Sequence, residues 1–196
     1  MARGAAFVLA ALLALAGCDR LSSPKTPFHA ADITGTTIGR SLALADHNGA
    51  PRTLADFRGK VVLLTFGYTR CPDVCPTTLS DLATAVRRLG DEGSRVQVLF
   101  VTVDPKRDSA ELLRSYVPAF DPRFLGLRGD AAATEKVEKE FRVYAAEREG
   151  RTPESYTVDH SAQIFAYDPE GRLRLMMQPG TPPDDIAADV RLLLNS

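Results

Sequence analysis

A short apolar run at residues 61–66, sequence VVLLTF, leads into two cysteines that stand four positions apart, Cys71 and Cys75. A run of this length without polar alternation is typical of a strand that is buried on both faces, as in a parallel sheet. Apolar residues then recur at helical spacing over 79–86, and a second apolar run follows at 96–103. This order predicts a strand, a helix and a parallel strand, and therefore an α/β fold.

The rest of the chain continues this alternation of strands and helices. Asn48 and Gly49 form a two-residue turn signal, which predicts a hairpin ahead of the first buried strand. Asp108, with Glu111 three positions later, is typical of a capping pair that starts a helix. The other expected elements are a helix marked by Val137, Phe141 and Tyr144, strands at 161–167 and 172–177, and a last helix opened by Thr181 and Pro182. We see no second domain, so we expect one folded domain, residues 41–196.

Charge and composition exclude several classes of protein. The 196 residues carry 24 Lys and Arg against 25 Asp and Glu, and no long basic run interrupts this balance. Because phosphate binding needs clustered basic side chains, we expect no nucleic acid as a partner. With 44% hydrophobic residues, the chain fits one globular domain plus a short extra segment, and a disordered, collagen-like or coiled-coil protein is excluded.

The first residues have the pattern of an export signal. Arg3 is followed by an uncharged run at residues 5–16, which is shorter than the roughly 20 residues that a membrane-spanning helix needs. The sequence Leu15-Ala16-Gly17-Cys18 resembles a bacterial lipoprotein signal, which predicts removal of residues 1–17 and acylation of Cys18. An ordinary signal peptide, cleaved nearby with Cys18 discarded, remains the alternative.

Residues 18–40 are expected to form a lipidated cysteine and a flexible tether. Ser, Thr, Pro and Gly are frequent in this segment and large apolar side chains are few, so little surface is available to offset the entropy of ordering it. As a random coil the tether would span about 25 Å. The predicted location is therefore the periplasmic side of a bacterial membrane, with the protein held there by lipid.

The chemistry of the chain is concentrated at Cys71 and Cys75. Pro72 and Pro76 follow the two cysteines and predict a turn at the start of the next helix, with Pro76 as its first residue. A thiolate at a helix N-terminus is stabilised by free N–H groups, which favours nucleophilic attack, metal ligation and a redox-active disulfide. A permanent structural disulfide is the alternative, although so short a loop would yield little stabilisation.

A metal site needs further ligands, and the chain has three histidines. His29 lies in the tether and His47 stands beside a turn, so we expect both to be solvated surface residues. His160 follows Tyr156-Thr157-Val158-Asp159 and is expected to start the strand predicted at 161–167, a position from which a side chain can project over the end of a sheet. Position alone leaves both a structural and a ligating role open for His160.

Three segments together resemble the signatures of the Sco (SenC) family: Gly67-Tyr68-Thr69-Arg70-Cys71-Pro72-Asp73-Val74-Cys75-Pro76, Val103-Asp104-Pro105-Lys106-Arg107-Asp108 and Val158-Asp159-His160. The resemblance covers about residues 40–196. It implies a thioredoxin-like fold, with a central mixed sheet flanked by helices and an N-terminal hairpin extension. It also implies a copper-binding protein that helps to assemble the dinuclear copper centre of cytochrome c oxidase subunit II.

The resemblance further assigns roles to single residues. It implies that Cys71, Cys75 and His160 are the copper ligands, and that Asp104 is an acidic residue near the site that tunes it. A plain turn residue before Pro105 is the alternative reading of Asp104. Two thiolates and an imidazole suit Cu(I), and the same set with a weak further ligand can hold Cu(II), whereas zinc would leave a fourth position open.

A different function is also compatible with the cysteine pair. Cys71 and Cys75 can act as a dithiol that reduces the cysteines of the oxidase subunit before copper enters. A pure reductase would not need His160, which distinguishes the two hypotheses. A peroxidase ranks below both, because a reactive thiol alone does not make a peroxide pocket. Beside the oxidase subunit, the expected partners are another periplasmic copper chaperone or a thioredoxin-like reductant.

Overall fold

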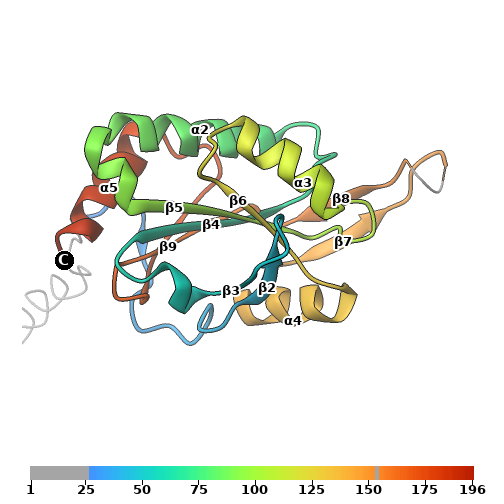
Figure 1. Ribbon diagram of the computed structural model, residues 1–196, viewed down its shortest axis with the longest axis horizontal. Coiled ribbons are helices and arrows are strands. Elements are labelled where there is room, and N and C mark those ends of the chain that lie inside the picture. The colour runs from blue at the N-terminus through green and yellow to red at the C-terminus, as the bar shows by residue number, and fades with distance from the viewer. Residues whose placement is uncertain (1–26, 153–154) are drawn as a thin grey trace, which may run out of the picture.

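The computed structural model describes residues 27–152 and 155–196 (Figure 1). The strands are β1 (Ala31–Asp32), β2 (Ala43–Asp46), β3 (Pro51–Thr53), β4 (Val61–Gly67), β5 (Val96–Thr102), β6 (Leu125–Arg128), β7 (Ala145–Arg148), β8 (Thr157–His160), β9 (Ile164–Tyr167) and β10 (Leu173–Met177). The α-helices are α2 (Val74–Arg88), α3 (Ala110–Tyr116), α4 (Ala131–Phe141) and α5 (Pro183–Leu194). Short 3₁₀-helices are η2 (Leu54–Phe57), η3 (Gly90–Arg95) and η4 (Val117–Ala119).

Eight strands form one mixed sheet in the order β1-β10-β9-β4-β5-β6-β2-β3. Strands β4, β5 and β6 are parallel, and the remaining pairs in the sheet are antiparallel. The predicted strand–helix–strand unit is therefore confirmed as β4, α2 and β5. The predicted hairpin is also confirmed, since β2 and β3 pair with each other and β2 extends the sheet beside β6.

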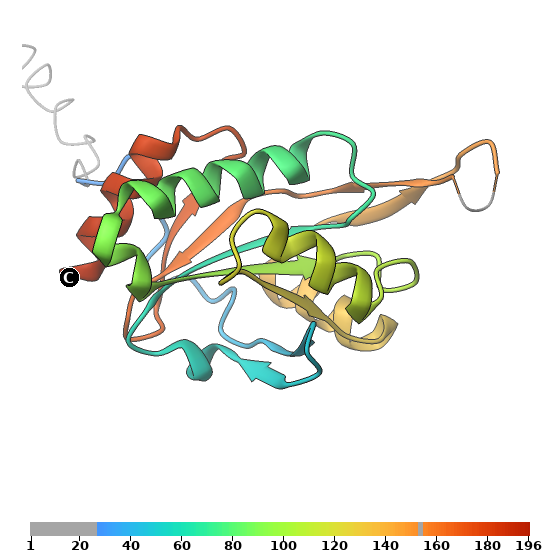
Figure 2. The same ribbon diagram turned by 45° about the horizontal axis from the view of Figure 1, so that its top comes forward.

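The helices cover both faces of the sheet. Figures 1 and 2 show α2, α3 and α5 on one face and α4 on the other. Because the chain passes from β4 to β5 to β6 in one direction, right-handed crossovers place α2 and α3 on the same face. Every residue of β4 and β5 is buried, as the unbroken apolar runs predict. On the α4 face, the ring of Phe141 packs at 5.2 Å from that of Phe66 and at 5.3 Å from that of Phe165.

A two-stranded ribbon, β7 and β8, stands apart from the main sheet. Figures 1 and 2 show it projecting beyond the sheet. The sequence did not predict this ribbon, because its strands bury few side chains and show no clear apolar alternation. The helix expected to include Tyr144 instead ends at Phe141, where Arg142 adopts a left-handed conformation with φ 54°. His160 is therefore the last residue of β8. The strand expected at 161–167 is shorter than predicted and corresponds to β9.

The described part of the expected tether, residues 27–40, packs on the domain, which corrects the prediction that it is mobile. Both carboxylate oxygens of Asp189 accept hydrogen bonds from this segment, from the N–H of His29 at 2.8 Å and of Ala30 at 2.9 Å. The short strand β1 then pairs with β10. Apolar side chains spaced along the segment pack against the core: Phe28, Ala30, Ile33 and Ile38. The composition of the segment could not reveal these partners, because they lie in distant parts of the sequence.

The predicted signal peptide, residues 1–17, and the predicted lipid attachment site, Cys18, lie outside the described residues. Both remain predictions from the sequence. Within the described ranges, none of the helices combines the length and the apolar character that a membrane span requires.

Candidate metal centre

Cys71 and Cys75 lie where the chain leaves the end of β4 and enters α2. The helix starts at Val74, so Cys75 occupies its first turn, and the start predicted at Pro76 is wrong by two residues. The N–H of Cys75 points at the sulfur of Cys71, with 3.4 Å between nitrogen and sulfur. Cys71 therefore places its sulfur at the N-terminus of α2, which is the electropositive position that the sequence predicted.

The sulfur of Cys75 packs directly against the end of β4. A Cβ atom added to Gly67 would lie 2.6 Å from this sulfur and 2.7 Å from the ring of Phe100. Only glycine leaves room for such an approach, so Gly67 fixes how deeply Cys75 sits. Cys75 is 3% exposed and Cys71 is 9% exposed, which leaves Cys71 as the thiol nearer to the surface.

His160 faces the two cysteines from the end of β8. Its Nε2 lies 3.4 Å from the sulfur of Cys75, and its Nδ1 lies 3.1 Å from the carbonyl oxygen of Val158. Because a carbonyl can only accept a hydrogen bond, Nδ1 carries the proton in a neutral ring and Nε2 keeps a free lone pair. Tyr68 supports this arrangement, since its ring meets His160 edge to face at 5.6 Å and its hydroxyl accepts the N–H of Val158.

The structure thus brings together the three ligand candidates. One donor atom each from Cys71, Cys75 and His160 lie within 4.8 Å of one another. A cavity of about 430 Å³ opens at this group, lined by Tyr68, Pro72, Asp73, Val74 and the end of β8 together with Cys71 and His160. Cys71 and His160 line the cavity and Cys75 is buried beside them, so two sulfurs and one imidazole nitrogen form a site that can hold a soft metal ion and exchange it with a partner.

The two thiols have opposite proton affinities. A hydrogen bond from the Cys75 thiol, reinforced by the N–H groups of Asp73 and Cys75, lowers the pKa of Cys71 to about 5, although burial opposes this effect. The pKa of Cys75 is raised well above its usual range by that same hydrogen bond and by its burial. Cys71 is therefore a thiolate at neutral pH, while Cys75 keeps its proton until a metal or a disulfide replaces it.

Asp108 is a residue of this site that the sequence reasoning missed. It is fully buried, and its carboxylate accepts hydrogen bonds from the Thr69 N–H at 3.1 Å, the Thr69 hydroxyl at 2.6 Å and the Thr102 hydroxyl at 2.6 Å. Burial raises the pKa of Asp108 despite these bonds. The predicted capping role belongs to Ser109, whose hydroxyl accepts the N–H of Leu112. The available signal was a threonine at or just after the end of each apolar strand, Thr102 as the last residue of β5 and Thr69 two residues after β4.

Asp104 lies at the base of the ribbon and is 2% exposed. Its carboxylate accepts a hydrogen bond from Arg107 at 2.5 Å and one from the Tyr156 hydroxyl at 2.8 Å. The guanidinium of Arg107 stacks on the Tyr156 ring at 3.4 Å and lies 5.7 Å from the Tyr68 ring, which borders His160. A link from Asp104 to the site therefore runs through Arg107 and Tyr68, and a role in tuning the site stays a prediction.

The other two histidines lie elsewhere in the fold. His47 is 4% exposed, and its Nδ1 accepts the N–H of Gly126 at 3.0 Å, so the prediction of a solvated surface residue is wrong. Burial lowers its pKa, which keeps the ring neutral and able to accept this bond. The side chain of His29 is 52% exposed and lies 3.6 Å from Asp185, as expected for a surface histidine.

Comparison with known proteins agrees with this geometry. The model of the SCO1/SenC family matches residues 30–195. The protein SCO2 homolog, mitochondrial, of Bos taurus is 45% identical over 132 residues, which are 66% of this chain and 50% of that protein. The chain spans about half the length of the first curated relatives that it matches.

Solved structures match over more of the chain. The structure of Bradyrhizobium japonicum ScoI with copper bound is 38% identical, covers 80% of this chain and 99% of that chain, and has a TM-score of 0.74. The apo Sco1 protein from Thermus thermophilus is 40% identical, covers 87% of this chain and 99% of that chain, and has a TM-score of 0.77. The mixed sheet flanked by helices is the thioredoxin-like fold of these neighbours, which confirms the expected fold. The chain belongs to the SCO1/SenC family.

Proposed function

We propose that this protein binds one copper ion through Cys71, Cys75 and His160 and delivers it to the dinuclear copper centre of cytochrome c oxidase subunit II. The observation that carries the proposal is the mutual distance of the three donor atoms, all within 4.8 Å. One metal ion can contact all three after small side-chain movements. In the solved structure from Bradyrhizobium japonicum, the matching protein holds copper.

The donor set favours copper over zinc. Thiolate sulfur is a soft ligand that selects Cu(I), and an imidazole nitrogen serves both Cu(I) and Cu(II). A structural zinc site would normally close with a fourth protein ligand, whereas Cys71 and His160 of this group line an open cavity. An open side also suits delivery, because an acceptor can approach and exchange ligands one at a time.

We further propose that Cys18 anchors the protein by lipid on the periplasmic side of a bacterial membrane. The support is the sequence Leu15-Ala16-Gly17-Cys18 that follows an uncharged run. An anchor on the same membrane as the acceptor would raise the effective concentration of the copper donor. Cys18→Ala should therefore yield a soluble or uncleaved protein. A variant that is still membrane-bound and labelled by fatty acid would contradict the anchor.

The copper proposal is tested by titrating the reduced protein with Cu(I), Cu(II) and Zn²⁺ and measuring absorption and metal content. We expect one copper per chain in both oxidation states, and copper that displaces zinc in competition. The protein oxidised to the Cys71–Cys75 disulfide should bind far less copper, because the ligands must be free thiolates. Equal copper content in both redox states would contradict a site that shares these sulfurs.

A second candidate function, reduction of disulfides, is favoured by the unequal thiols. Cys71 is the more exposed cysteine and has a pKa of about 5, as expected for an attacking thiolate, whereas Cys75 is buried and protonated. The Cys71 thiolate would attack a disulfide of the oxidase subunit and form a mixed disulfide. Cys75 would then attack Cys71 and give its proton to the leaving thiolate, so that two electrons pass to the substrate and this chain ends as a disulfide.

The two functions differ in their need for His160. His160→Ala should impair copper delivery if the chain is a copper donor, while a pure reductase should retain its rate of disulfide reduction. The assay follows both reactions with purified oxidised or copper-free subunit II. Turnover as a reductase would also require a thioredoxin-like donor of electrons. Copper loading would require a periplasmic copper chaperone. Both proteins can be supplied in the assay.

A further inference from the structure

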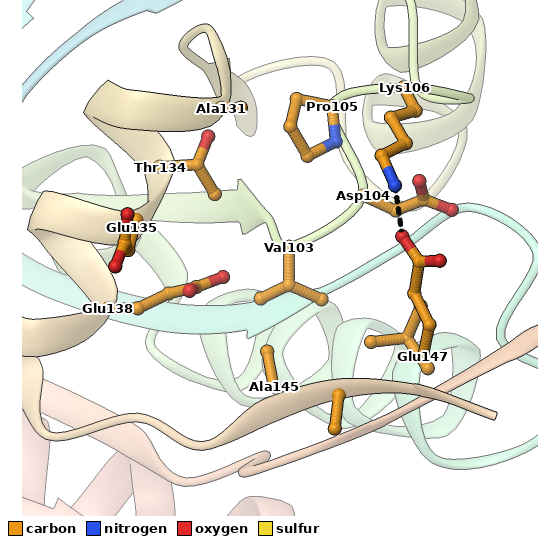
Figure 3. A pocket seen from close by; sticks show the side chains of 12 residues that line it. Val103, Asp104, Pro105, Lys106, Ala131, Thr134, Glu135, Glu138, Ala145 and Glu147 are labelled. Atoms are coloured by element: carbon orange, nitrogen blue, oxygen red, sulfur yellow. Dashed lines mark hydrogen bonds and ion pairs between the residues drawn. The ribbon is translucent and has the colours of Figure 1, made fainter.

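A second cavity lies on the flank of the candidate metal centre. Its volume is about 190 Å³, and it opens between the start of α4, the loop that follows β5 and the strand β7 (Figure 3). Val158 lines this cavity and also the larger one at Cys71 and His160, so the two cavities share a wall. The two cavities therefore adjoin at Val158, and a partner protein that covers both sides of this residue can contact both of them.

Four carboxylates line the cavity, and one of them has no partner. Three are paired with cations at 2.5 Å between nitrogen and oxygen: Asp104 with Arg107, Glu135 with Lys139, and Glu147 with Lys106. The carboxylate of Glu138 has neither a hydrogen bond nor an ion pair among the residues that the structure describes. Burial, together with the nearby charge of Glu135, raises the pKa of Glu138. An added cation at Glu138 would relieve this unfavourable environment.

Thr134 supplies a second unsatisfied group in the same cavity. The residue is 4% exposed, and in the described part of the chain its hydroxyl has no hydrogen-bond partner. Thr134 precedes Glu138 by one helical turn, so the two residues share a face of α4. Figure 3 shows both side chains projecting from the helix toward Val103 and Pro105. A buried hydroxyl normally has a hydrogen-bond partner. We therefore expect a hydrogen-bond donor from a bound molecule to lie between Thr134 and Glu138.

The remaining walls restrict what the donor can be. Val103, Pro105, Ala145 and Val158 present apolar surface. A calcium ion needs six to eight oxygen ligands, far more than the two unpaired groups supply. A water molecule would satisfy Thr134 but would leave the charge of Glu138 uncompensated. An alkyl chain that ends in an ammonium group matches both parts, because its methylenes fit the apolar walls and its N–H groups reach the two oxygens.

We propose that this cavity receives a lysine side chain of the protein that docks at the metal centre, with the ammonium group between Glu138 and Thr134. This lysine contact orients the partner while the neighbouring cavity presents the metal ligands. The role in delivery rests on the proposed function, whereas binding of an alkylammonium group does not.

The proposal is tested by NMR on the purified full-length protein, reduced and free of copper. The probe is Nα-acetyl-lysine N-methylamide, and its Nε-acetylated form serves as the control ligand. We expect saturable shifts of the methyl signals of Thr134, Val103 and Val158 with the first ligand only. Glu138→Gln should weaken binding at least tenfold and Thr134→Val severalfold. Glu111→Gln, which makes the same charge change outside the cavity, should alter affinity less than twofold.

Several results would overturn the proposal. These are the absence of saturable shifts, equal binding of the Nε-acetylated ligand, and unchanged affinity in Glu138→Gln. Mg²⁺ or Ca²⁺ binding at Glu138 in place of the amine would overturn it as well. In a further case, the lysine amide binds but Glu138→Gln delivers copper to subunit II as fast as Glu111→Gln. The cavity would then bind free amines, and the proposed contact with a lysine of the partner would be refuted. If the unaltered protein delivers no copper while the amide binds, the proposed function fails and the cavity assignment stands.

Discussion

The buried carboxylate of Asp189 at one end of the domain and the three donor atoms of the candidate metal centre at the other end have opposite kinds of partners. Figures 1 and 2 place α5 and the start of the described chain at one end, and the first turn of α2 with the ribbon at the other. At the first end, Asp189 is fully buried and both of its carboxylate oxygens accept backbone N–H groups. At the second end, Cys71, Cys75 and His160 direct their donor atoms mainly at one another.

This difference separates stability from function. A buried carboxylate with satisfied hydrogen bonds stabilises the fold, and its loss leaves buried donors without a partner. The sulfur of Cys71 and the imidazole of His160 line an open cavity and keep lone pairs for a ligand, while Cys75 also packs against the end of β4. Substitution of Asp189 should therefore change stability and leave copper binding intact, and substitution of Cys71 or His160 should do the reverse.

The largest expected effect is the loss of copper in Cys71→Ser. Removal of one of the two thiolates should lower Cu(I) affinity by on the order of 10³-fold or more, because metal binding depends on deprotonated sulfur. The free energy of unfolding should change by less than about 1 kcal/mol. Competition with a chromophoric Cu(I) chelator measures the affinity. Cys18→Ser is the matched control and should bind copper as the unaltered chain does; retained affinity in Cys71→Ser would contradict the site.

The next effect is at the opposite end. Asp189→Ala should lower the free energy of unfolding by about 3 kcal/mol, because a fully buried carboxylate is removed and two part-buried N–H groups lose their charged acceptor. Copper stoichiometry should stay at one per chain. Asp185→Ala, on the same helix but facing His29 at the surface, should cost less than about 1 kcal/mol. Urea unfolding of the three proteins tests this order, and an Asp189→Ala variant as stable as Asp185→Ala would contradict a stabilising role for the hydrogen bonds to Asp189.

A smaller effect is expected when only the imidazole is removed. His160→Ala should lose the Cu(II) form, since two thiolates alone reduce cupric ion, and should retain Cu(I) with affinity lowered on the order of 10- to 100-fold. The Cys71–Cys75 disulfide should still form. Absorption and electron paramagnetic resonance spectra detect the Cu(II) form. His29→Ala is the control; an unaltered Cu(II) spectrum in His160→Ala would return His160 to a structural role.

The smallest effect concerns the proton on Cys71. Since its folded pKa is about 5, the thiolate is present above that pH and is lost as the pH falls through it. Alkylation of Cys71 by iodoacetamide in the reduced, copper-free protein should therefore be half-maximal near pH 5. Cys75→Ala removes the hydrogen bond that contributes most to this shift and should move the midpoint upward. A midpoint near that of an ordinary thiol in the unaltered chain would refute the assignment.

The parts of the fold that were predictable are those with strong local patterns. Continuous apolar runs predicted β4 and β5, helical spacing predicted α2, and Asn48 with Gly49 predicted the hairpin of β2 and β3. The ribbon of β7 and β8 was missed because its side chains are largely exposed and carry no apolar period. The packing of residues 27–40 was missed because Asp189 lies about 160 residues away in the sequence.

The site was predictable only in part for a related reason. Prolines beside Cys71 and Cys75 placed both thiols near a helix N-terminus, and the structure agrees apart from a two-residue shift. His160 could not be chosen from position alone, since its distance to Cys75 follows from how the ribbon folds back; the family resemblance pointed to it. His47 and Asp108 were misjudged because their partners, Gly126 and the two threonines, are set by tertiary contacts.

X-ray absorption at the copper edge tests the central claim most directly. In the protein loaded with one copper, the account predicts two sulfur ligands and one imidazole nitrogen, and the imidazole signal should vanish in His160→Ala while both sulfurs remain. His29→Ala should leave the spectrum unchanged. A copper environment without sulfur, or one whose imidazole signal survives in His160→Ala, would contradict the assignment of Cys71, Cys75 and His160 as the copper site.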